Sequence, residues 1–170
     1  MNLKHYIRDI PDFPSKGILF KDITPLLIDP EAMNQATEAL LKLIGNLRID
    51  KVVGMESRGF FFGPLLASKL NVGFVPVRKP GKLPAEKISL TYDLEYGSDT
   101  LEIHSDSIRK GDRVLIHDDV LATGGTAKAT CDLIESLGGE VVQCNFLMIL
   151  GFLKGREKLN GYEVKSLIEY

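Results

Sequence analysis

One stretch in the second half of the chain limits the possible folds more than any other. Residues 114–129 read VLIHDDVLATGGTAKA and open with an apolar, β-branched run. Such a run is typical of a strand buried in a parallel sheet. Asp118 and Asp119 follow at the carboxyl end of the expected strand, and the small residues TGGT then lead into an expected helix over residues 126–137. A strand, a polar loop and a helix in this order predict an α/β domain with a parallel sheet.

The loop after this strand has the chemistry of a phosphate site. Gly124 and Gly125 let the backbone approach a ligand closely, Thr123 and Thr126 add hydroxyl donors, and the first N–H groups of a helix favour an anion. The two acids would repel a phosphate but suit neighbouring hydroxyl groups, a Mg²⁺ ion or a developing cation. A phosphate beside a diol describes a ribose 5-phosphate. The plainer alternative is an ordinary strand–turn–helix with surface aspartates, and the loop lacks the lysine of a Walker A motif.

Two other strand ends carry groups that suit anions. An expected strand over residues 51–56 leads into Ser57 and Arg58, and another over residues 73–77 leads into three cations, Arg78, Lys79 and Lys82. The alternatives are a surface ion pair for Arg58 and a solvated basic face for the three cations. Their position after central strands favours anion binding, because ligands of open α/β sheets bind outside the carboxyl ends of the strands.

Composition agrees with an ordinary globular protein. The chain has 170 residues, 44% hydrophobic and 26% charged, so we expect one domain over residues 1–170. A net charge of −2 and short apolar runs argue against a nucleic-acid or membrane surface, and we expect neither partner. The first residues lack a signal-peptide core, which predicts a cytoplasmic protein. Cys131 and Cys144 are expected to be reduced core thiols.

The N-terminal part is expected to form a small hood over about residues 1–28. Apolar spacing predicts a short helix over residues 1–9. The segment 13–25, FPSKGILFKDITP, is apolar and bounded by Gly and Pro. It could pack on the core as a loop, or it could cover a flat heteroaromatic ligand on which Phe13 stacks; the residues alone leave both alternatives open.

Alternating apolar residues predict a β-hairpin over about residues 83–105, with Glu95 and Tyr96 near its tip. This hairpin could end in a simple polar turn, or it could be a lid that excludes water from a reactive cation. Apolar strands over residues 141–150 and 162–170 complete the expected sheet. His117 is expected to point into a polar layer beside the site, in a tuning or structural role.

The stretch 114–129 resembles the phosphoribosyl-diphosphate (PRPP) signature of the type I phosphoribosyltransferases: a hydrophobic strand, two acids and TGGT. It departs from that pattern at His117, where the family usually has another apolar residue. The hood segment, the LEYG run and the segment GFLKGREKL resemble the adenine phosphoribosyltransferases within this family. The resemblance covers nearly the whole chain. It implies the type I phosphoribosyltransferase fold, an α/β domain with an open, mostly parallel central sheet flanked by helices, a small N-terminal hood and a lid hairpin.

The resemblance also implies roles for individual residues. The phosphate of PRPP or AMP would bind the loop formed by Ala122, Thr123, Gly124, Gly125 and Thr126. The diphosphate would bind Ser57, Arg58, Arg78, Lys79 and Lys82. Adenine would bind Phe13, Leu19, Lys21 and Arg58. The catalytic residues would be Glu95, Asp118 and Asp119, with Tyr96 ordering the closed lid.

By this resemblance the chain is a purine-salvage glycosyltransferase that converts adenine and PRPP to AMP and diphosphate. Mg²⁺ would arrive with the substrate, without a dedicated protein cage, and the resemblance implies a homodimer. One alternative is transfer to another base, such as xanthine, guanine or orotate, against which the hood sequence argues. Another is a PRPP- or purine-sensing regulator, against which the presence of Glu95 and the lack of a basic helix argue.

Overall fold

The computed structural model describes residues 2–94 and 97–170, and the chain divides into two compact units, Met1–Ala39 and Leu40–Tyr170. The elements of the first unit are η1 (Leu3–Tyr6), β1 (Arg8–Pro11), β2 (Leu19–Asp22), α1 (Thr24–Ile28) and the first part of α2 (Pro30–Ile44). All other elements belong to the second unit, which contains every strand of the central sheet.

The N-terminal unit corrects one expectation. The helix expected over residues 1–9 is a 3₁₀ turn that ends at Tyr6, and the chain then enters strand β1, which pairs antiparallel with β2. Two ion pairs join these strands: Arg8 to Asp22 at 2.7 Å and Lys21 to Asp9 at 2.6 Å. Cross-strand pairs of opposite charge stabilise a sheet. The partner strand therefore decides the conformation of this segment against its local helical spacing.

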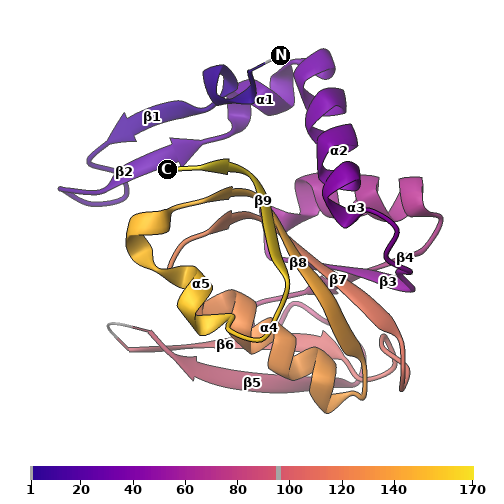
Figure 1. Ribbon diagram of the computed structural model, residues 1–170. Helices are drawn as coiled ribbons and strands as arrows, with labels where there is room; N and C mark the ends of the chain where they lie inside the picture. The colour runs from indigo at the N-terminus through magenta and orange to yellow at the C-terminus, as the bar shows by residue number, and fades with distance from the viewer. Residues whose placement is uncertain (1, 95–96) are drawn as a thin grey trace. The chain divides into compact units, whose positions relative to one another are not determined.

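The second unit is built on a parallel sheet, as the sequence predicts. Its strands are β3 (Lys51–Met55), β4 (Gly73–Val77), β7 (Arg113–Leu121), β8 (Glu140–Ile149) and β9 (Val164–Glu169). They lie in the order β4-β3-β7-β8-β9, and every neighbouring pair is parallel. The strand with the two acids is thus the middle one (Figure 1).

The expected hairpin is also present. Strands β5 (Lys87–Asp93) and β6 (Ser98–His104) pair antiparallel as a separate sheet. Figure 1 shows this hairpin beside α4 (Gly125–Ser136), on one side of the central sheet. Residues of both elements join one buried cluster with alternate residues of the central strands, among them Val53, Met55 and Ile116. Alternation along a strand sends the intervening residues to the opposite face.

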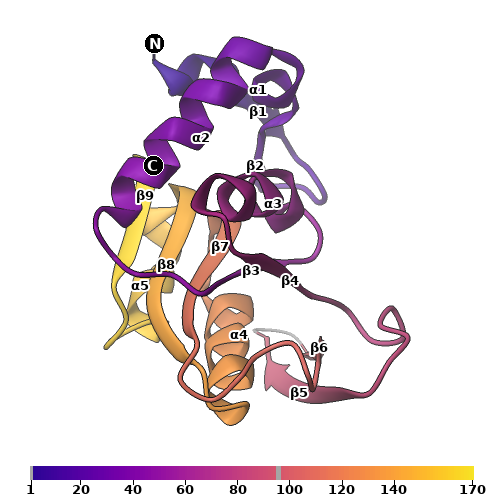
Figure 2. The ribbon, with the colours of Figure 1, turned by 90° about the vertical axis from the view of Figure 1, so that its right-hand side faces the viewer.

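Helix α3 (Gly59–Leu70) packs against β3, β4 and β7 on that opposite face (Figure 2). Its approach to the sheet is close, because a Cβ at Gly54 or at Gly63 would lie within 2.7 Å of the Phe74 ring. After β8 the chain forms two short turns, η2 (Gly151–Leu153) and α5 (Gly155–Lys158).

The end of β7 differs from the expectation and creates the site. The strand does not stop before the acids but continues to Leu121, because its pairing with β8 extends that far. On its other edge, pairing with β3 ends at His117. Asp118 and Asp119 therefore lie where β7 has lost one neighbouring strand, which leaves room for a ligand.

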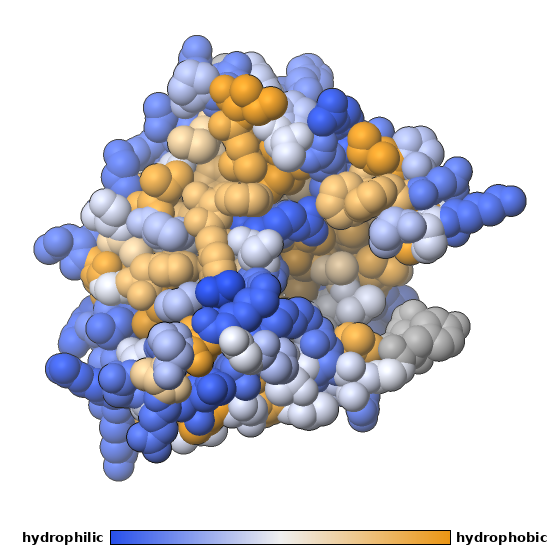
Figure 3. Space-filling model, turned by 180° about the vertical axis from the view of Figure 1, so that it is seen from behind, coloured by the Kyte–Doolittle hydropathy of each residue, from blue (hydrophilic) through white to orange (hydrophobic). Residues whose placement is uncertain are grey.

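Apolar side chains also reach the surface. Large ones that are exposed include Phe13, Ile18, Leu19, Ile28, Phe61, Leu94, Phe152 and Leu153. Figure 3 shows apolar and hydrophilic side chains on the side of the molecule opposite to the view of Figure 1. Within residues 2–94 and 97–170, no helix combines the length and the apolarity that crossing a membrane requires.

Candidate active site

The two adjacent acids at the end of β7 have different surroundings. Asp119 is only 2% exposed, whereas Asp118 is half-buried. The Nε atom of Arg58 lies 3.2 Å from Oδ2 of Asp119, which places a cation over the buried acid. Among the described residues, that buried oxygen has no partner with hydrogen-bond geometry, so the charge of Arg58 is what compensates it. The ion pair thus holds Arg58 beside the end of β7.

Burial acts on the protonation of both acids. Burial, and next the neighbouring Asp119 carboxylate, raise the pKa of Asp118. Burial also raises the pKa of Asp119, and the Arg58 guanidinium opposes this effect. Two carboxylates held together out of water are unfavourable for folding, and such an arrangement is common where a positive charge must be bound.

A single glycine brings the Arg58 loop onto the acids. A Cβ at Gly59 would lie 2.8 Å from the backbone oxygen of His117 and 3.2 Å from Oδ1 of Asp118. Helix α3 begins at this glycine, directly after Arg58. Only a residue without a side chain allows the helix to start against the strand at this point. The sequence ESRG therefore places Arg58 beside Asp119 by backbone contact.

The loop expected to bind phosphate has the predicted form. Gly124 precedes α4 with φ +82°, a left-handed conformation that favours glycine. The loop borders a cavity of about 90 Å³, whose lining includes Asp118 and the loop residues Ala122, Thr123, Gly124, Gly125 and Thr126. The first residues of α4 line this cavity, and the N-terminus of a helix favours an anion through its N–H groups and its dipole.

Backbone contacts with Gly155 support this loop, and the sequence reading missed them. A Cβ at Gly124 would lie 2.5 Å from the Gly155 oxygen, and a Cβ at Gly155 would lie 2.2 Å from the Ala122 oxygen. In the sequence, the segment GFLKGREKL stands out only by its resemblance to the family. A glycine inside a basic segment gives little signal by itself, since its partner is 31 residues away in the chain.

The three cations after β4 surround one acid, Glu56. Its carboxylate accepts hydrogen bonds from Arg78 Nε at 3.0 Å, the Lys79 backbone N–H at 2.8 Å and Lys82 Nζ at 2.5 Å. Burial opposes ionisation, but these three donors lower the pKa of Glu56 to about 2. The Glu56 side chain is 10% exposed and fixes the basic turn to the end of β3.

A larger cavity of about 330 Å³ brings the predicted groups together. Its lining includes Ser57, Arg58, Lys79, Asp118, Asp119, Ala122 and Thr126. Of the residues expected at a diphosphate, Arg78 and Lys82 are not in this lining and instead contact Glu56. The structure therefore places three of the five expected diphosphate ligands at the cavity.

The residues assigned to adenine, apart from Arg58, lie in the N-terminal unit. Phe13 is 50% exposed and meets Phe20 edge-to-face at 5.1 Å. Leu19 is exposed, and the side chain of Lys21 is buried against Asp9. Glu95 and Tyr96, assigned to acid–base chemistry and to the lid, lie outside the described residues.

His117 lies in a buried polar layer under the acids, as the sequence predicts. Its Nδ1 is 3.3 Å from Oδ1 of Asn145, which in turn donates to the Leu40 oxygen and to Gln143. Burial lowers the pKa of His117 to about 4, so the ring is neutral at pH 7. The structure adds Asn145 as the partner of His117 and Gln143 as a partner of Asn145, and the sequence analysis predicted neither.

Together these groups place a helix N-terminus, the cations Arg58 and Lys79 and the adjacent acids Asp118 and Asp119 around neighbouring cavities. A helix N-terminus and cations suit anions, and the acids suit hydroxyl groups or a positive charge. Within the described part of the chain, no three His, Cys, Asp or Glu side chains gather in a way that could hold a metal ion.

Comparison with known proteins agrees with this geometry. Residues 23–167 match the model of the phosphoribosyl transferase domain, so the chain belongs to the phosphoribosyltransferases. The adenine phosphoribosyltransferase of Christiangramia forsetii is 66% identical over 170 residues, which cover 100% of this chain and 99% of that protein. Within the family, the chain therefore belongs to the adenine phosphoribosyltransferases.

Solved structures give the same result. The crystal structure of adenine phosphoribosyltransferase from Thermoanaerobacter pseudethanolicus is 56% identical, with a TM-score of 0.97 over 99% of this chain and 98% of that one. The Saccharomyces cerevisiae enzyme, complexed with an imino-altritol bisphosphate and adenine, is 48% identical, with a TM-score of 0.89 over 96% and 95% of the two chains. The predicted fold class and family are confirmed.

Proposed function

We propose that this protein transfers the 5-phosphoribosyl group of PRPP to adenine, giving AMP and diphosphate. The observation that carries this proposal is the cavity of about 330 Å³, whose lining joins part of the loop expected to bind phosphate, the cations Arg58 and Lys79, and the adjacent acids Asp118 and Asp119. These are the groups that a phosphorylated ribose with a diphosphate leaving group requires. The adenine phosphoribosyltransferase relatives support adenine as the acceptor.

The 5-phosphate binds the loop formed by residues 122–126 in this proposal. Its charge suits the N-terminus of α4, and the hydroxyl groups of Thr123 and Thr126 supply further donors. The Gly155 backbone holds the loop in shape before the substrate arrives. This preorganisation fixes one end of the sugar, so that its C1′ atom is positioned relative to the acids.

The diphosphate binds at the opposite end of the cavity. Ser57, Arg58 and Lys79 line this end, and we propose that Arg78 and Lys82 contribute positive potential from their positions on Glu56. As the bond from C1′ to the diphosphate oxygen breaks, negative charge grows on the leaving group. Cations that are already in place stabilise this charge without reorganisation.

The two acids, Asp118 and Asp119, act on the ribose ring from which the diphosphate leaves. Positive charge develops on the ribose ring, as it does in glycoside hydrolysis. In this proposal Asp118 and Asp119, which both line the cavity, hold the ribose hydroxyl groups. Their negative charge favours the ring cation until a nitrogen of adenine bonds to C1′.

The base and the proton complete the proposal. We propose that Phe13 stacks on adenine, that the backbones of Leu19 and Lys21 contact its edge, and that Arg58 lies near it. Phe13 and Leu19 are exposed, which fits a role in binding a ligand. Glu95 would exchange the proton of the imidazole ring of adenine, and Tyr96 would order the closed lid.

We further propose that Mg²⁺ enters with PRPP, bound mainly by substrate oxygens. The half-buried carboxylate of Asp118 at the cavity is an oxygen ligand of the type that Mg²⁺ accepts. The ion would neutralise diphosphate charge. We also propose a homodimer, which the exposed Phe61, Phe152 and Leu153 support, and a cytoplasmic location, which the two buried free thiols support.

A substrate panel tests the proposed function. The protein is incubated with PRPP and Mg²⁺, and with adenine, guanine, hypoxanthine or xanthine in parallel, and nucleotide formation is followed. We expect AMP from adenine and little product from the other bases. Turnover of another base alone would refute adenine as the substrate. PRPP binding without any turnover would favour the alternative function, a PRPP- or purine-sensing regulator.

A further inference from the structure

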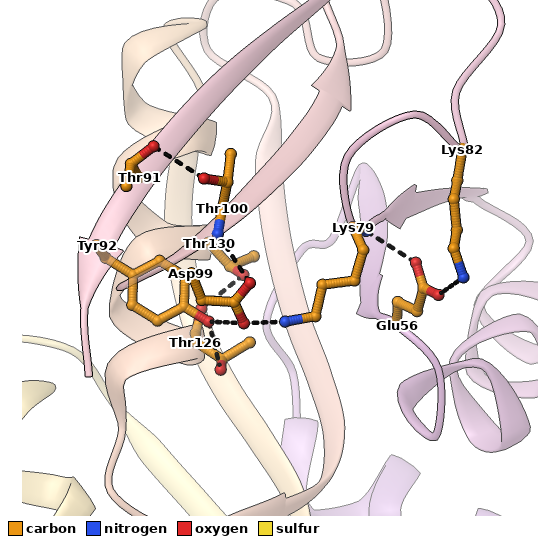
Figure 4. Close-up of polar contacts among 9 residues, drawn as sticks. All are labelled: Glu56, Lys79, Lys82, Thr91, Tyr92, Asp99, Thr100, Thr126 and Thr130. Atoms are coloured by element: carbon orange, nitrogen blue, oxygen red, sulfur yellow. Dashed lines mark hydrogen bonds and ion pairs between the residues drawn. The ribbon is translucent and has the colours of Figure 1, made fainter. Parts of the chain in front are cut away.

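Four side chains, those of Thr126, Tyr92, Asp99 and Lys79, form a chain of two hydrogen bonds and one ion pair between the two ends of the proposed PRPP site (Figure 4). Thr126 of the phosphate loop lies 3.0 Å from the hydroxyl group of Tyr92 on β5, which donates to Oδ2 of Asp99 on β6 at 3.2 Å. The same Asp99 oxygen is paired with Nζ of Lys79. The β5–β6 hairpin is therefore bonded at once to the phosphate loop and to the basic turn.

Counting protons gives the direction of each bond. A carboxylate only accepts, so Tyr92 must use its single proton toward Asp99. The contact between Tyr92 and Thr126 then needs a proton from Thr126. The Thr126 hydroxyl proton is thus directed to Tyr92. The Lys79 ammonium keeps two further protons, but its ion pair with Asp99 holds the side chain and offsets its charge.

A bound substrate would need both of these groups. The 5-phosphate accepts hydrogen bonds only, so it can recruit the Thr126 hydroxyl only if that proton leaves Tyr92. The diphosphate recruits Lys79 in competition with Asp99. The Lys79–Asp99 pair is 40% and 25% exposed, and exposed pairs of this kind are weak, so a polyanion can displace the carboxylate.

The other acid at the basic turn differs from Asp99. Glu56 accepts from the Lys79 backbone N–H as well as from Arg78 and Lys82, and it is less exposed than Asp99. Its contact with the Lys79 backbone fixes the course of the chain, whereas Asp99 meets Lys79 only at the tip of the lysine side chain. Glu56 is therefore expected to stay in place when the substrate binds.

We propose that Asp99 and Tyr92 determine affinity for PRPP by occupying Lys79 and Thr126 in the substrate-free protein, from which the two anionic ends of PRPP displace them. This inference rests on the proposed function, because it takes residues 122–126 and Lys79 as the ligands of the two ends. It also predicts the direction of the effect: removing the interacting group of Asp99 or of Tyr92 strengthens ligand binding.

Calorimetry with two half-ligands tests the proposal on the full chain. Asp99→Asn is titrated with magnesium diphosphate, and we expect binding about two- to fivefold tighter than in the wild type, the range of one exposed ion pair. Asp106→Asn removes the same charge from an exposed position just after β6, and it controls for net charge. Unchanged or weaker binding by Asp99→Asn would overturn the proposal.

Tyr92→Phe provides a test without any change of charge. It removes only the hydroxyl group that holds Thr126, so ribose 5-phosphate should bind about two- to tenfold tighter, as expected for one neutral hydrogen bond. Thr91→Val is the matched control, because Thr91 bonds to Thr100 on the same hairpin at 2.9 Å. Weaker binding by Tyr92→Phe would show that Tyr92 positions Thr126 for phosphate and would overturn the proposal.

These results separate the inference from the proposed function. If the wild type binds neither diphosphate nor ribose 5-phosphate, the proposed function itself fails. If the wild type binds both, and the variants bind no more tightly, only the proposal that Asp99 and Tyr92 compete with PRPP fails.

Discussion

Gly155→Ala tests whether backbone contact shapes the phosphate site. The new Cβ would lie 2.2 Å from the Ala122 oxygen and 3.1 Å from the Gly124 nitrogen, and both are backbone atoms. Carbon–oxygen contacts under 3.0 Å are not tolerated, so the loop or the start of α5 must move by about 1 Å. No flexible side chain can absorb this change.

The size of the effect follows from that displacement. Overpacking of this kind costs about 1–3 kcal/mol of stability, which lowers the melting temperature by roughly 2–12 °C for a chain of this length. A displacement of about 1 Å in a binding loop can reduce activity by about 10²-fold. We therefore expect the KM for PRPP to rise by about 10- to 100-fold, with a smaller change in the KM for adenine.

The assay measures initial rates against PRPP and adenine separately, well below the melting temperature of each variant. Gly73→Ala is the matched control, because the nearest atoms to its Cβ are the tip of the flexible Lys51 side chain, at 3.2 Å. An unchanged KM for PRPP in Gly155→Ala would refute the argument that this contact shapes the loop, even if the melting temperature falls.

Three further predictions concern charged or titrating groups. Asp119→Asn should lower kcat by about 10²–10³-fold. Its melting temperature should stay the same or rise, because burial raises the pKa of Asp119 and the ionised carboxylate opposes folding; a fall in stability as large as the fall in activity would contradict this. Glu56→Gln should destabilise the protein by about 1–2 kcal/mol at pH 7, less than its pKa implies because Arg78 and Lys82 are partly exposed. The pKa of Glu56 falls from 4.5 to about 2 on folding, so the difference in free energy of unfolding between the wild type and Glu56→Gln, measured with urea, should shrink as the pH falls from 4.5 to 2. A difference that stays constant over this pH range would exclude the pairing. The pKa of His117 falls from 6.5 to about 4, so wild-type stability should decline by up to about 3 kcal/mol as the pH drops through that range. His117→Val should decline less over the same range, and an equal decline in both proteins would assign the acid sensitivity to other groups.

The parts of the site that the sequence predicts are those encoded by neighbouring residues. The VLIHDD strand, the TGGT loop and the ESRG turn each contain the apolar run, the glycine and the polar groups that their local structure needs. A parallel sheet then brings their strand ends to one edge, because parallel strands all end on the same side. This rule alone is enough to place Arg58 and Thr126 at one cavity.

The missed features depend on partners far away in the chain. Strand β1 forms because β2 supplies opposite charges, which outweigh the helical spacing of residues 1–9. Gly155 acts through the shape of a distant loop, and Asp99 through Lys79, 20 residues earlier. A hairpin pattern shows which side chains alternate, but it does not show which polar group each one meets.

The extension of β7 to Leu121 has the same origin. The acids of this segment are poor strand formers, and a local reading ends the strand before them. Pairing with β8 continues the strand, while β3 ends earlier, and this mismatch of strand lengths opens the cavity. The length of a strand is decided by its neighbours, so the local sequence underestimates it.

The most direct test of the central claim is a crystal structure of the protein with magnesium PRPP and an unreactive adenine analogue. We expect the 5-phosphate on residues 122–126, the diphosphate beside Arg58 and Lys79, and the ribose hydroxyl groups at Asp118 and Asp119. Density for PRPP elsewhere, or with its two ends reversed, would contradict the account of the site.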